Sequence, residues 1–243
     1  MSIFKDDILA GKVALITGGG SGIGKGITET FMAHGADTVI VSRNQGKLDA
    51  VAAELAAATG RRCLPVAADV RDEAAVYAAV DAAMAEFGRI DVVINGAAGN
   101  FLAPPARLKP KGFRTVMEID TLGTYHVCRA AFDRALRDNG GYIINLTATL
   151  HYTGVPLQIH AGAAKAAIDA MTKHLAMEWG CLDIKVNSIA PGPIDTEANR
   201  TTTPQEMVAD IVKGIPLSRM GETDDLVGMC LFLLSDQAKW VTG

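Results

Sequence analysis

A glycine-rich turn is the first pattern in the sequence whose residue types and spacing could serve chemistry. It reads Thr17-Gly-Gly-Gly-Ser-Gly-Ile-Gly24 and directly follows a β-branched run. In such a turn, glycines permit a sharp bend, let the backbone approach a pyrophosphate and allow a helix to pack closely on a strand. The phosphates then lie at the N-terminus of the following helix. The turn therefore predicts a dinucleotide site formed by Gly18, Gly20, Ser21, Gly22, Ile23 and Gly24.

The end of the second predicted strand indicates which dinucleotide binds. An acidic residue at that place would bind a free ribose 2′-hydroxyl and repel a 2′-phosphate. Here the sequence has Ser42-Arg43, and an arginine offers a planar fork of donors that suits phosphate. Ser21 adds a hydroxyl donor nearby. We therefore expect NADPH rather than NADH, the alternative being that Arg43 is an ordinary solvated arginine.

Candidate cofactor contacts also follow the next two strands. Asp69 and Val70 come after the third strand, where they would hold the adenine. Asn95 ends the fourth strand and begins a run of small residues, up to Gly99, against which a cofactor ribose would lie. Each signal is weak alone, but their recurrence at successive strand ends favours one shared site.

The elements that position these residues alternate between short β-branched runs and longer helical patterns. Several of the runs are apolar on consecutive residues, which is typical of parallel strands buried on both faces. The sequence thus predicts an α/β fold with a doubly wound parallel sheet, in which ligands bind beyond the carboxyl ends of the strands. The strands are predicted at 13–17, 38–42, 63–67, 91–95, 141–145 and 184–188, and helices at 46–58, 72–86 and 159–179.

Composition narrows the class of protein. A chain of 243 residues with 49% hydrophobic and 21% charged residues predicts one domain with a sizeable core rather than a disordered chain. A net charge of −4 argues against a nucleic-acid-binding face. The four cysteines are too scattered for a zinc site, so no metal is expected. The longest apolar stretch, 226–234, is about half the roughly 20 residues of a membrane helix, and 1–11 does not resemble a secretory signal. We expect an intracellular protein that binds neither membrane nor nucleic acid.

The motifs together resemble the short-chain dehydrogenase/reductase family over almost the whole chain. That resemblance rests on the glycine turn, Asn95-x-Ala-x-Gly99, Lys165 on a predicted helix and Pro191-Gly192 after the sixth strand. More narrowly, five segments resemble the 2,4-dienoyl-CoA reductases, and their peroxisomal branch most of all. These segments are Ala97–Phe101, Glu118–Asp120, Asn145–Thr149, His160–Ala167 and Ala190–Pro193.

The resemblance implies several further properties. It adds Pro191, Gly192 and Ile194 to the cofactor-binding residues and assigns Lys165 to the nicotinamide ribose. It implies one NADP-binding Rossmann domain over 1–243 with a substrate loop near 191–214. It also implies a homotetramer assembled through helices near 113–138 and 159–179.

Two positions depart from the wider family. Most members carry a tyrosine four residues before the lysine and a serine at the end of the fifth strand. Here those places hold Ala161 and Ala148. Tyr152 lies thirteen residues before Lys165 and cannot stand one helical turn away from it. The departures argue against conventional carbonyl reduction.

The remaining candidate catalytic residues are Asp120 and Lys165. A carboxylate and an ammonium facing one pocket can hold and polarise a water that replaces the phenol as proton donor. The resemblance implies hydride addition at C5 of a 2,4-dienoyl thioester and protonation at C2, which gives a trans-3-enoyl-CoA. The acidic partner of Lys165 would be Asp120 or an aspartate of the family that falls beyond Gly243. The competing interpretation of Asp120 is a helix residue in a surface ion pair.

Substrate contacts can also be predicted. Phe101 would cover the diene or the nicotinamide, although a lone aromatic is more often part of a core. Arg43, Arg71, Lys109 and Lys111 would form a cationic rim for the CoA phosphates. His151 and His160 lie near the active region in the sequence, but nothing in the sequence supports either as a catalyst.

Two other functions remain open at this point. One is a different enoyl or carbonyl reductase, and the other is a catalytically silent NADP(H)-binding sensor, which the missing tyrosine and serine would permit. The compartment would be the cytoplasm in a bacterium and the peroxisome in a eukaryote. Family members continue beyond the place that matches 240–243, so we expect this chain to lack their last sheet strand.

Overall fold

The computed structural model describes residues 3–243, and these residues form a parallel sheet in the order β3-β2-β1-β4-β5-β6. The chain builds outward from β1 to β3 and then returns to build from β4 to β6. The direction of winding therefore reverses between β1 and β4, where doubly wound folds bind ligands. Every predicted strand is confirmed to within one residue. The strands are β1 (Val13–Thr17), β2 (Asp37–Ser42), β3 (Cys63–Ala67), β4 (Val92–Asn95), β5 (Gly141–Leu146) and β6 (Ile184–Ile189).

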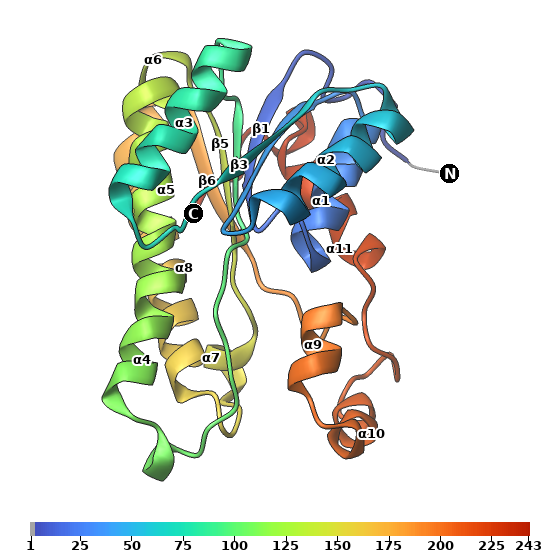
Figure 1. Ribbon diagram of the computed structural model, residues 1–243, viewed down its shortest axis with the longest axis vertical. Helices are drawn as coiled ribbons and strands as arrows, with labels where there is room; N and C mark the ends of the chain where they lie inside the picture. Colours follow the sequence, from blue (N-terminus) through green and yellow to red (C-terminus); the bar gives the residue numbers. More distant parts are fainter. Residues whose placement is uncertain (1–2) are drawn as a thin grey trace.

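Helices cover both faces of the sheet, with α1, α2 and α11 on one face and α3, α5 and α8 on the other (Figure 1). The α-helices are α1 (Gly22–Ala33), α2 (Gln45–Thr59), α3 (Glu73–Phe87), α4 (Pro110–Met117), α5 (Gly123–Ala131), α6 (Arg137–Asn139), α7 (Leu150–Thr153), α8 (Ile159–Trp179), α9 (Glu197–Thr202), α10 (Gln205–Lys213) and α11 (Asp224–Leu233). Short 3₁₀ turns are η1 (Pro105–Arg107), η4 (Gly180–Leu182) and η5 (Asp236–Ala238), and π-helical turns are η2 (Glu118–Leu122) and η3 (Phe132–Leu136).

The apolar runs of the strands are explained by burial on both faces. Successive side chains of a strand point to opposite sides of the sheet. In β1, Leu15 packs in the core layer that includes Val80 of α3, whereas Ile16 packs in the layer that includes Ile27 of α1. All four side chains are buried. Because neither face meets water, consecutive positions must be apolar, as in other parallel sheets.

The bounds of α2 and α3 follow from their capping residues. Asn44 accepts a hydrogen bond from the third residue of α2, and Asp72 does the same for α3. Each helix ends at a glycine with positive φ, Gly60 at 70° and Gly88 at 72°. Side-chain caps and left-handed glycines are common helix boundaries. The helices predicted at 46–58 and 72–86 are therefore confirmed, with the second shifted by one residue because Asp72 is its cap.

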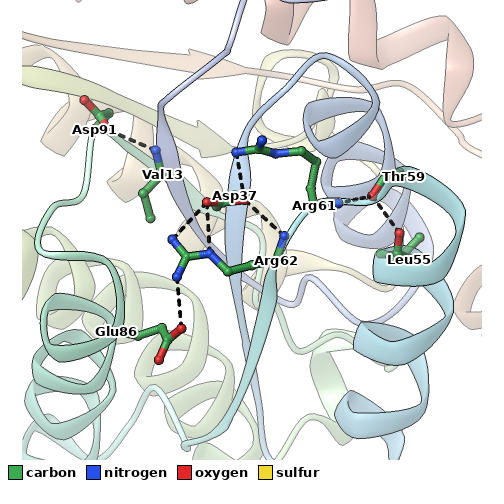
Figure 2. Close-up of polar contacts among 8 residues, drawn as sticks. All are labelled: Val13, Asp37, Leu55, Thr59, Arg61, Arg62, Glu86 and Asp91. Atoms are coloured by element: carbon green, nitrogen blue, oxygen red, sulfur yellow. Dashed lines mark hydrogen bonds and ion pairs between the residues drawn. The ribbon is translucent and has the colours of Figure 1, made fainter.

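Ion pairs link neighbouring segments at the end of the sheet where the strands begin. Figure 2 shows Arg61 and Arg62 converging on Asp37 at the start of β2, with Arg62 also reaching Glu86. Each such pair is worth only about 0–1 kcal/mol where it is exposed. These pairs tie the start of β2 to the segment before β3 and to α3, at the end of the sheet opposite the carboxyl ends of the strands.

Several helices extend beyond the carboxyl ends of the strands. Helices α4, α7, α9 and α10 all lie at that end (Figure 1). The loop predicted near 191–214 contains α9 and α10, so most of it is helical. Within residues 3–243, no helix has both the length and the apolar character to cross a membrane.

The C-terminal residues run along the outer edge of β6. The Gly243 N–H donates to the Val186 carbonyl at 2.8 Å, and the Asn187 side chain donates to the Val241 carbonyl at 2.9 Å. The C-terminus accordingly lies beside β6 (Figure 1). Among residues 3–243, β6 is the edge strand on this side of the sheet.

Candidate active site

A cavity of about 500 Å³ opens at the carboxyl ends of β1, β4 and β5. It lies where the winding of the sheet reverses, the usual ligand position of doubly wound folds. Most of the predicted site residues line it. Those that do are Gly18, Ser21, Gly22, Ile23, Gly24, Arg43, Asp69, Val70, Asp120, Lys165 and Pro191.

The glycine turn is closely packed against neighbouring backbone. Gly18 has φ +72°, and a Cβ there would lie 2.9 Å from the Gly96 carbonyl oxygen. A Cβ on Gly24 would lie 2.2 Å from the Gly18 carbonyl oxygen. Both distances are shorter than real Cβ contacts, so glycine is required at each place. The turn therefore brings the first turn of α1 directly against the end of β1.

The N-terminus of α1 presents unused hydrogen-bond donors to the cavity. Ser21 is the capping residue, but its side chain makes no capping hydrogen bond, and the first turn contains no acidic residue. The backbone N–H groups at the start of a helix and its dipole favour an anion. The glycines and the serine hydroxyl thus fit the pyrophosphate of a dinucleotide.

Arg43 and Arg71 differ in how their charge is used. Arg43 lines the cavity and makes no ion pair with any of residues 3–243. Arg71 is held by Asp69, whose carboxylate accepts both the Arg71 backbone N–H and its guanidinium. These hydrogen bonds lower the pKa of the Asp69 carboxyl. Arg71 therefore already has a carboxylate partner, whereas Arg43 keeps its donors available. The contact of Arg71 with a CoA phosphate stays a prediction.

The side chain of Asn95 points into the sheet rather than into the cavity. Its amide donates to Asn145 at 2.8 Å and approaches Cys128 at 3.2 Å, and Asn145 donates to Thr172 of α8. This chain of hydrogen bonds joins β4, β5 and α8. The Asn95 amide thus satisfies buried neighbours. The prediction that a ribose lies against the run from Asn95 to Gly99 stays a prediction, and Gly96, Ala97, Ala98 and Gly99 of that run line the cavity.

The remaining predicted contacts lie outside the cavity lining. Gly20 faces Leu48 of α2, and Ile194 is paired with Gly221 by an isolated bridge that supports the start of α9. The others outside the lining are Gly192, Phe101, Lys109 and Lys111. Both lysines are exposed at the start of α4.

The centre of the cavity is a buried ion pair. Asp120 is 1% exposed and lies on the π-helical turn η2, an irregularity frequent at functional sites. One carboxylate oxygen accepts the Gly99 N–H at 2.7 Å, and the other lies 3.3 Å from Lys165 Nζ. Lys165 also donates to the Leu146 carbonyl at 3.0 Å. The burial excludes the competing interpretation of Asp120 as a surface ion pair.

The ion pair has hydrogen-bonding capacity to spare. Burial raises the pKa of the Asp120 carboxyl, and the Lys165 ammonium and the Gly99 amide only partly oppose that shift. An ammonium has three donors, and Lys165 directs one to Leu146 and one to Asp120. Ala148 and Ala161 also line the cavity, and their methyl groups leave space beside the lysine. The arrangement can hold a water or another small polar group.

Some cavity residues were not predicted from the sequence. Thr196, which caps α9, lies over the glycine turn, since a Cβ on Gly22 would be 3.4 Å from its methyl carbon. Asn199 of α9 also lines the cavity. A threonine followed by an acidic residue is a common helix start, so Thr196-Glu197 was a usable signal. Nothing in the sequence showed that this helix folds back over the first turn.

Comparison with known proteins gives a consistent result. A family model described as enoyl-(acyl carrier protein) reductase matches residues 18–243. A relative from Pongo abelii, the peroxisomal 2,4-dienoyl-CoA reductase [(3E)-enoyl-CoA-producing], is 53% identical over 243 residues, which cover 99% of this chain and 83% of that protein. The Arabidopsis thaliana protein of the same name is 44% identical over 100% of this chain and 84% of its own length.

Solved structures show the same architecture. A short-chain type dehydrogenase/reductase from Mycobacterium ulcerans matches with a TM-score of 0.91 and 33% identity, covering 96% of this chain and 86% of that one. A citronellol catabolism dehydrogenase from Pseudomonas aeruginosa PAO1 matches with a TM-score of 0.87 and 33% identity, covering 99% and 94%.

Proposed function

Because this chain belongs to the short-chain dehydrogenase/reductase family of oxidoreductases, we propose that it reduces 2,4-dienoyl-CoA to trans-3-enoyl-CoA with NADPH during the oxidation of unsaturated fatty acids. The observation that carries the proposal is the buried Asp120–Lys165 pair in a cavity where Ala148 and Ala161 replace the usual serine and tyrosine. The names of relatives about half identical to this chain support the substrate class.

The cavity residues fit a nicotinamide dinucleotide. Ser21 and the first turn of α1 would bind the pyrophosphate, and Arg43 would bind the 2′-phosphate of NADPH. Asp69 and Val70 would contact the adenine. Lys165 would bind the nicotinamide ribose. The unpaired guanidinium of Arg43 is the feature that favours NADPH over NADH.

The residues around the cavity would then direct the proton. A bound NADPH supplies a hydride for C5 of the dienoyl thioester. Lys165 and Asp120 would hold a water that gives its proton to C2, while the remaining double bond forms between C3 and C4. The water recovers its proton from solvent through the same pair. Hydrogen-bond donors facing the thioester oxygen would stabilise the enolate that forms between the two steps.

Residues outside the cavity lining are proposed to contact the acyl-CoA substrate. Lys109 and Lys111 are exposed and make no ion pair among residues 3–243, so they remain candidates for the CoA phosphates, with Arg43 beside the cavity. Phe101 would cover the diene or the nicotinamide. We further propose a homotetramer, located in the cytoplasm of a bacterium or in the peroxisome of a eukaryote.

The direct test is a spectrophotometric assay of NADPH oxidation with 2,4-hexadienoyl-CoA, with chromatographic identification of the product. We expect turnover, and trans-3-hexenoyl-CoA rather than a 2-enoyl product. Tight NADPH binding without turnover of any dienoyl or enoyl thioester would instead support a silent sensor. Turnover of simple enoyl or carbonyl substrates alone would support a different reductase.

The cofactor preference is tested by Arg43→Ala. Loss of a charge-assisted contact of about 1.5–3 kcal/mol predicts NADPH binding weaker by about 10- to 100-fold. NADH binding should change little, because it has no 2′-phosphate. Arg137→Ala, at the far end of the fold, is the matched control. Equal losses for both cofactors would show that Arg43 does not bind the 2′-phosphate.

A further inference from the structure

The imidazole of His160 is buried without a hydrogen-bond partner. His160 lies in the first turn of α8 with 0% of its surface exposed, and neither ring nitrogen has a partner among residues 3–243. Its ring stacks on Phe101, with centroids 4.4 Å apart and an interplanar angle of 30°. A buried polar group without a partner destabilises a fold, so its presence calls for a functional explanation.

The segment that carries Phe101 is attached to the start of α8 at two further points. The Asn100 amide donates to Gln158 at 2.6 Å, and the Ala103 N–H donates to the Leu157 carbonyl at 3.0 Å. Leu157 has φ +67°, a left-handed conformation that is costly for a residue with a side chain. Strained residues of this kind gather at functional sites. The stacked pair therefore lies on segments that are held together beside the cavity, whose lining includes their neighbours Asn100 and Ala161.

The same segment also contacts the ion pair at the centre of the cavity. Gly99, two residues before Phe101, donates its N–H to Asp120. Helix α8 packs against η2, which carries Asp120. A charge on His160 would help to lower the pKa of the Asp120 carboxyl, so the two side chains lie within electrostatic reach. Phe101 is 38% exposed, so one side of the stacked pair is accessible.

We propose, on the basis of the proposed function, that His160 is a positioning residue for Asp120: when an acyl-CoA seats against Phe101, the stacked rings shift and a His160 ring N–H donates to the Asp120 carboxylate. Asp120 is the assigned acceptor because it is a buried carboxylate on η2, the turn that packs against α8. The new hydrogen bond fixes the carboxylate toward Lys165. Seating of the acyl chain is thereby coupled to the group that holds the proton-donating water.

The first test uses His160→Phe, which keeps a stacked ring but removes both nitrogens. We expect kcat to fall about 10-fold, the loss of one hydrogen bond to a charged group. KM for acyl-CoA and NADPH binding should stay within twofold, and the melting temperature should not fall. His160→Gln, which restores an N–H donor, should recover most of the lost kcat. Exposed His174 on the same helix provides the control His174→Gln.

A kcat of His160→Phe equal to that of the unaltered protein would overturn the proposal. It would also be overturned if His160→Gln were as slow as His160→Phe and both melted earlier, because that pattern indicates packing alone.

The second test needs no variant to be active. In protein labelled with ¹⁵N-histidine, the His160 ring signals are assigned by their absence in His160→Gln. We expect them to shift toward a hydrogen-bonded N–H when NADP⁺ and hexanoyl-CoA are added together, while the His174 signals stay unchanged. Unchanged His160 signals would overturn the proposal. If the unaltered protein failed to reduce a dienoyl-CoA, the proposed function would fail, and this response would still decide the role of His160.

Discussion

Two buried carboxylates near α8 have opposite environments. Asp120 has one backbone N–H and one ammonium as partners, and it lines the cavity. Asp169 lies one helical turn beyond Lys165 and away from the cavity lining. Its carboxylate accepts hydrogen bonds from His151 and Ser188, each at 2.8 Å, and from the Tyr152 hydroxyl.

The contrast shows that hydrogen bonds decide whether the pKa of a buried carboxyl group is raised or lowered. Burial opposes ionisation of both groups. For Asp169, the hydrogen bonds from Tyr152, Ser188 and His151 outweigh burial and lower the pKa of the carboxyl. For Asp120, burial prevails over Lys165 and Gly99 and raises the pKa. We infer that Asp169 stabilises the fold, whereas Asp120 is left incompletely satisfied for chemistry.

The largest expected effect comes from removing the ammonium. Lys165→Met should lower kcat about 10³-fold, within the range for loss of a proton-transfer group. It should also weaken NADPH binding, since we propose that the lysine binds the nicotinamide ribose. Lys173→Met, an exposed lysine on the same helix, is the matched control and should keep full activity. Steady-state kinetics with a dienoyl-CoA measure both, and a Lys165→Met enzyme within tenfold of normal would contradict the assignment.

Asp169→Asn should act on stability instead. The amide cannot accept all three hydrogen bonds, so we expect the free energy of unfolding to fall by about 2–4 kcal/mol. Activity per folded molecule should change less than twofold. Urea unfolding together with kinetics separates the two effects. A large loss of kcat with unchanged stability would place Asp169 in the catalytic machinery and remove the contrast with Asp120.

The pH dependence of stability also tests whether the ionised Asp169 carboxylate stabilises the fold. Because the folded pKa of Asp169 is lowered, its carboxylate contributes stability above the ordinary value of 3.8 and loses it as the pH falls toward the folded value. As the pH falls below 3.8, the unaltered protein should therefore lose more stability than Asp169→Asn does. Urea midpoints measured at several acidic pH values test this, and parallel curves would contradict it.

Asp120→Asn is expected to change activity by a smaller factor than loss of the lysine, about 10²-fold. Its informative readout is the pH profile. The folded pKa of Asp120 is raised, so activity that needs its carboxylate should already be lost, as the pH falls, at a pH above 3.8. Protonation of this group stabilises the folded state over the same pH range, because the folded state binds the proton more tightly than the unfolded state does. The acidic limb of kcat/KM should disappear in Asp120→Asn. A limb that persists unchanged belongs to another group.

The fold and the glycine-turn side of the cavity were predictable, because strand periodicity and glycine spacing are local signals. The sequence placed Gly18 and Gly24 at the turn and Arg43 at the next strand end, and all three line the cavity. The hydrogen-bond partners of the cavity side chains were harder to predict from the sequence. Whether Arg71 is unpaired depends on how Asp69 folds back two residues, and the sequence pattern does not contain that geometry.

The role of aromatic and histidine residues depended wholly on tertiary contacts. Nothing in the sequence supported His160 as a catalyst, because the partners of a histidine cannot be read from the sequence. Its burial and its stacking on Phe101 come from segments 59 residues apart, which only the fold brings together. The same holds for Tyr152, which sequence reasoning set aside for its spacing from Lys165 and which the structure joins to Asp169 instead.

The smallest expected effect comes from removing the hydrogen bond between Tyr152 and Asp169. Tyr152 is 66% exposed, but its hydroxyl donates to the buried Asp169 carboxylate, and this hydrogen bond raises the pKa of the phenol. Tyr152→Phe should lower the free energy of unfolding by about 1 kcal/mol. It should leave kcat unchanged, because Ala161, not Tyr152, occupies the place of the family's proton-donating tyrosine. His151 and Ser188 keep the carboxylate satisfied, so the loss should be well below that of Asp169→Asn. A fall in kcat of tenfold or more would make the phenol a proton donor and would return this enzyme to the usual chemistry of its family.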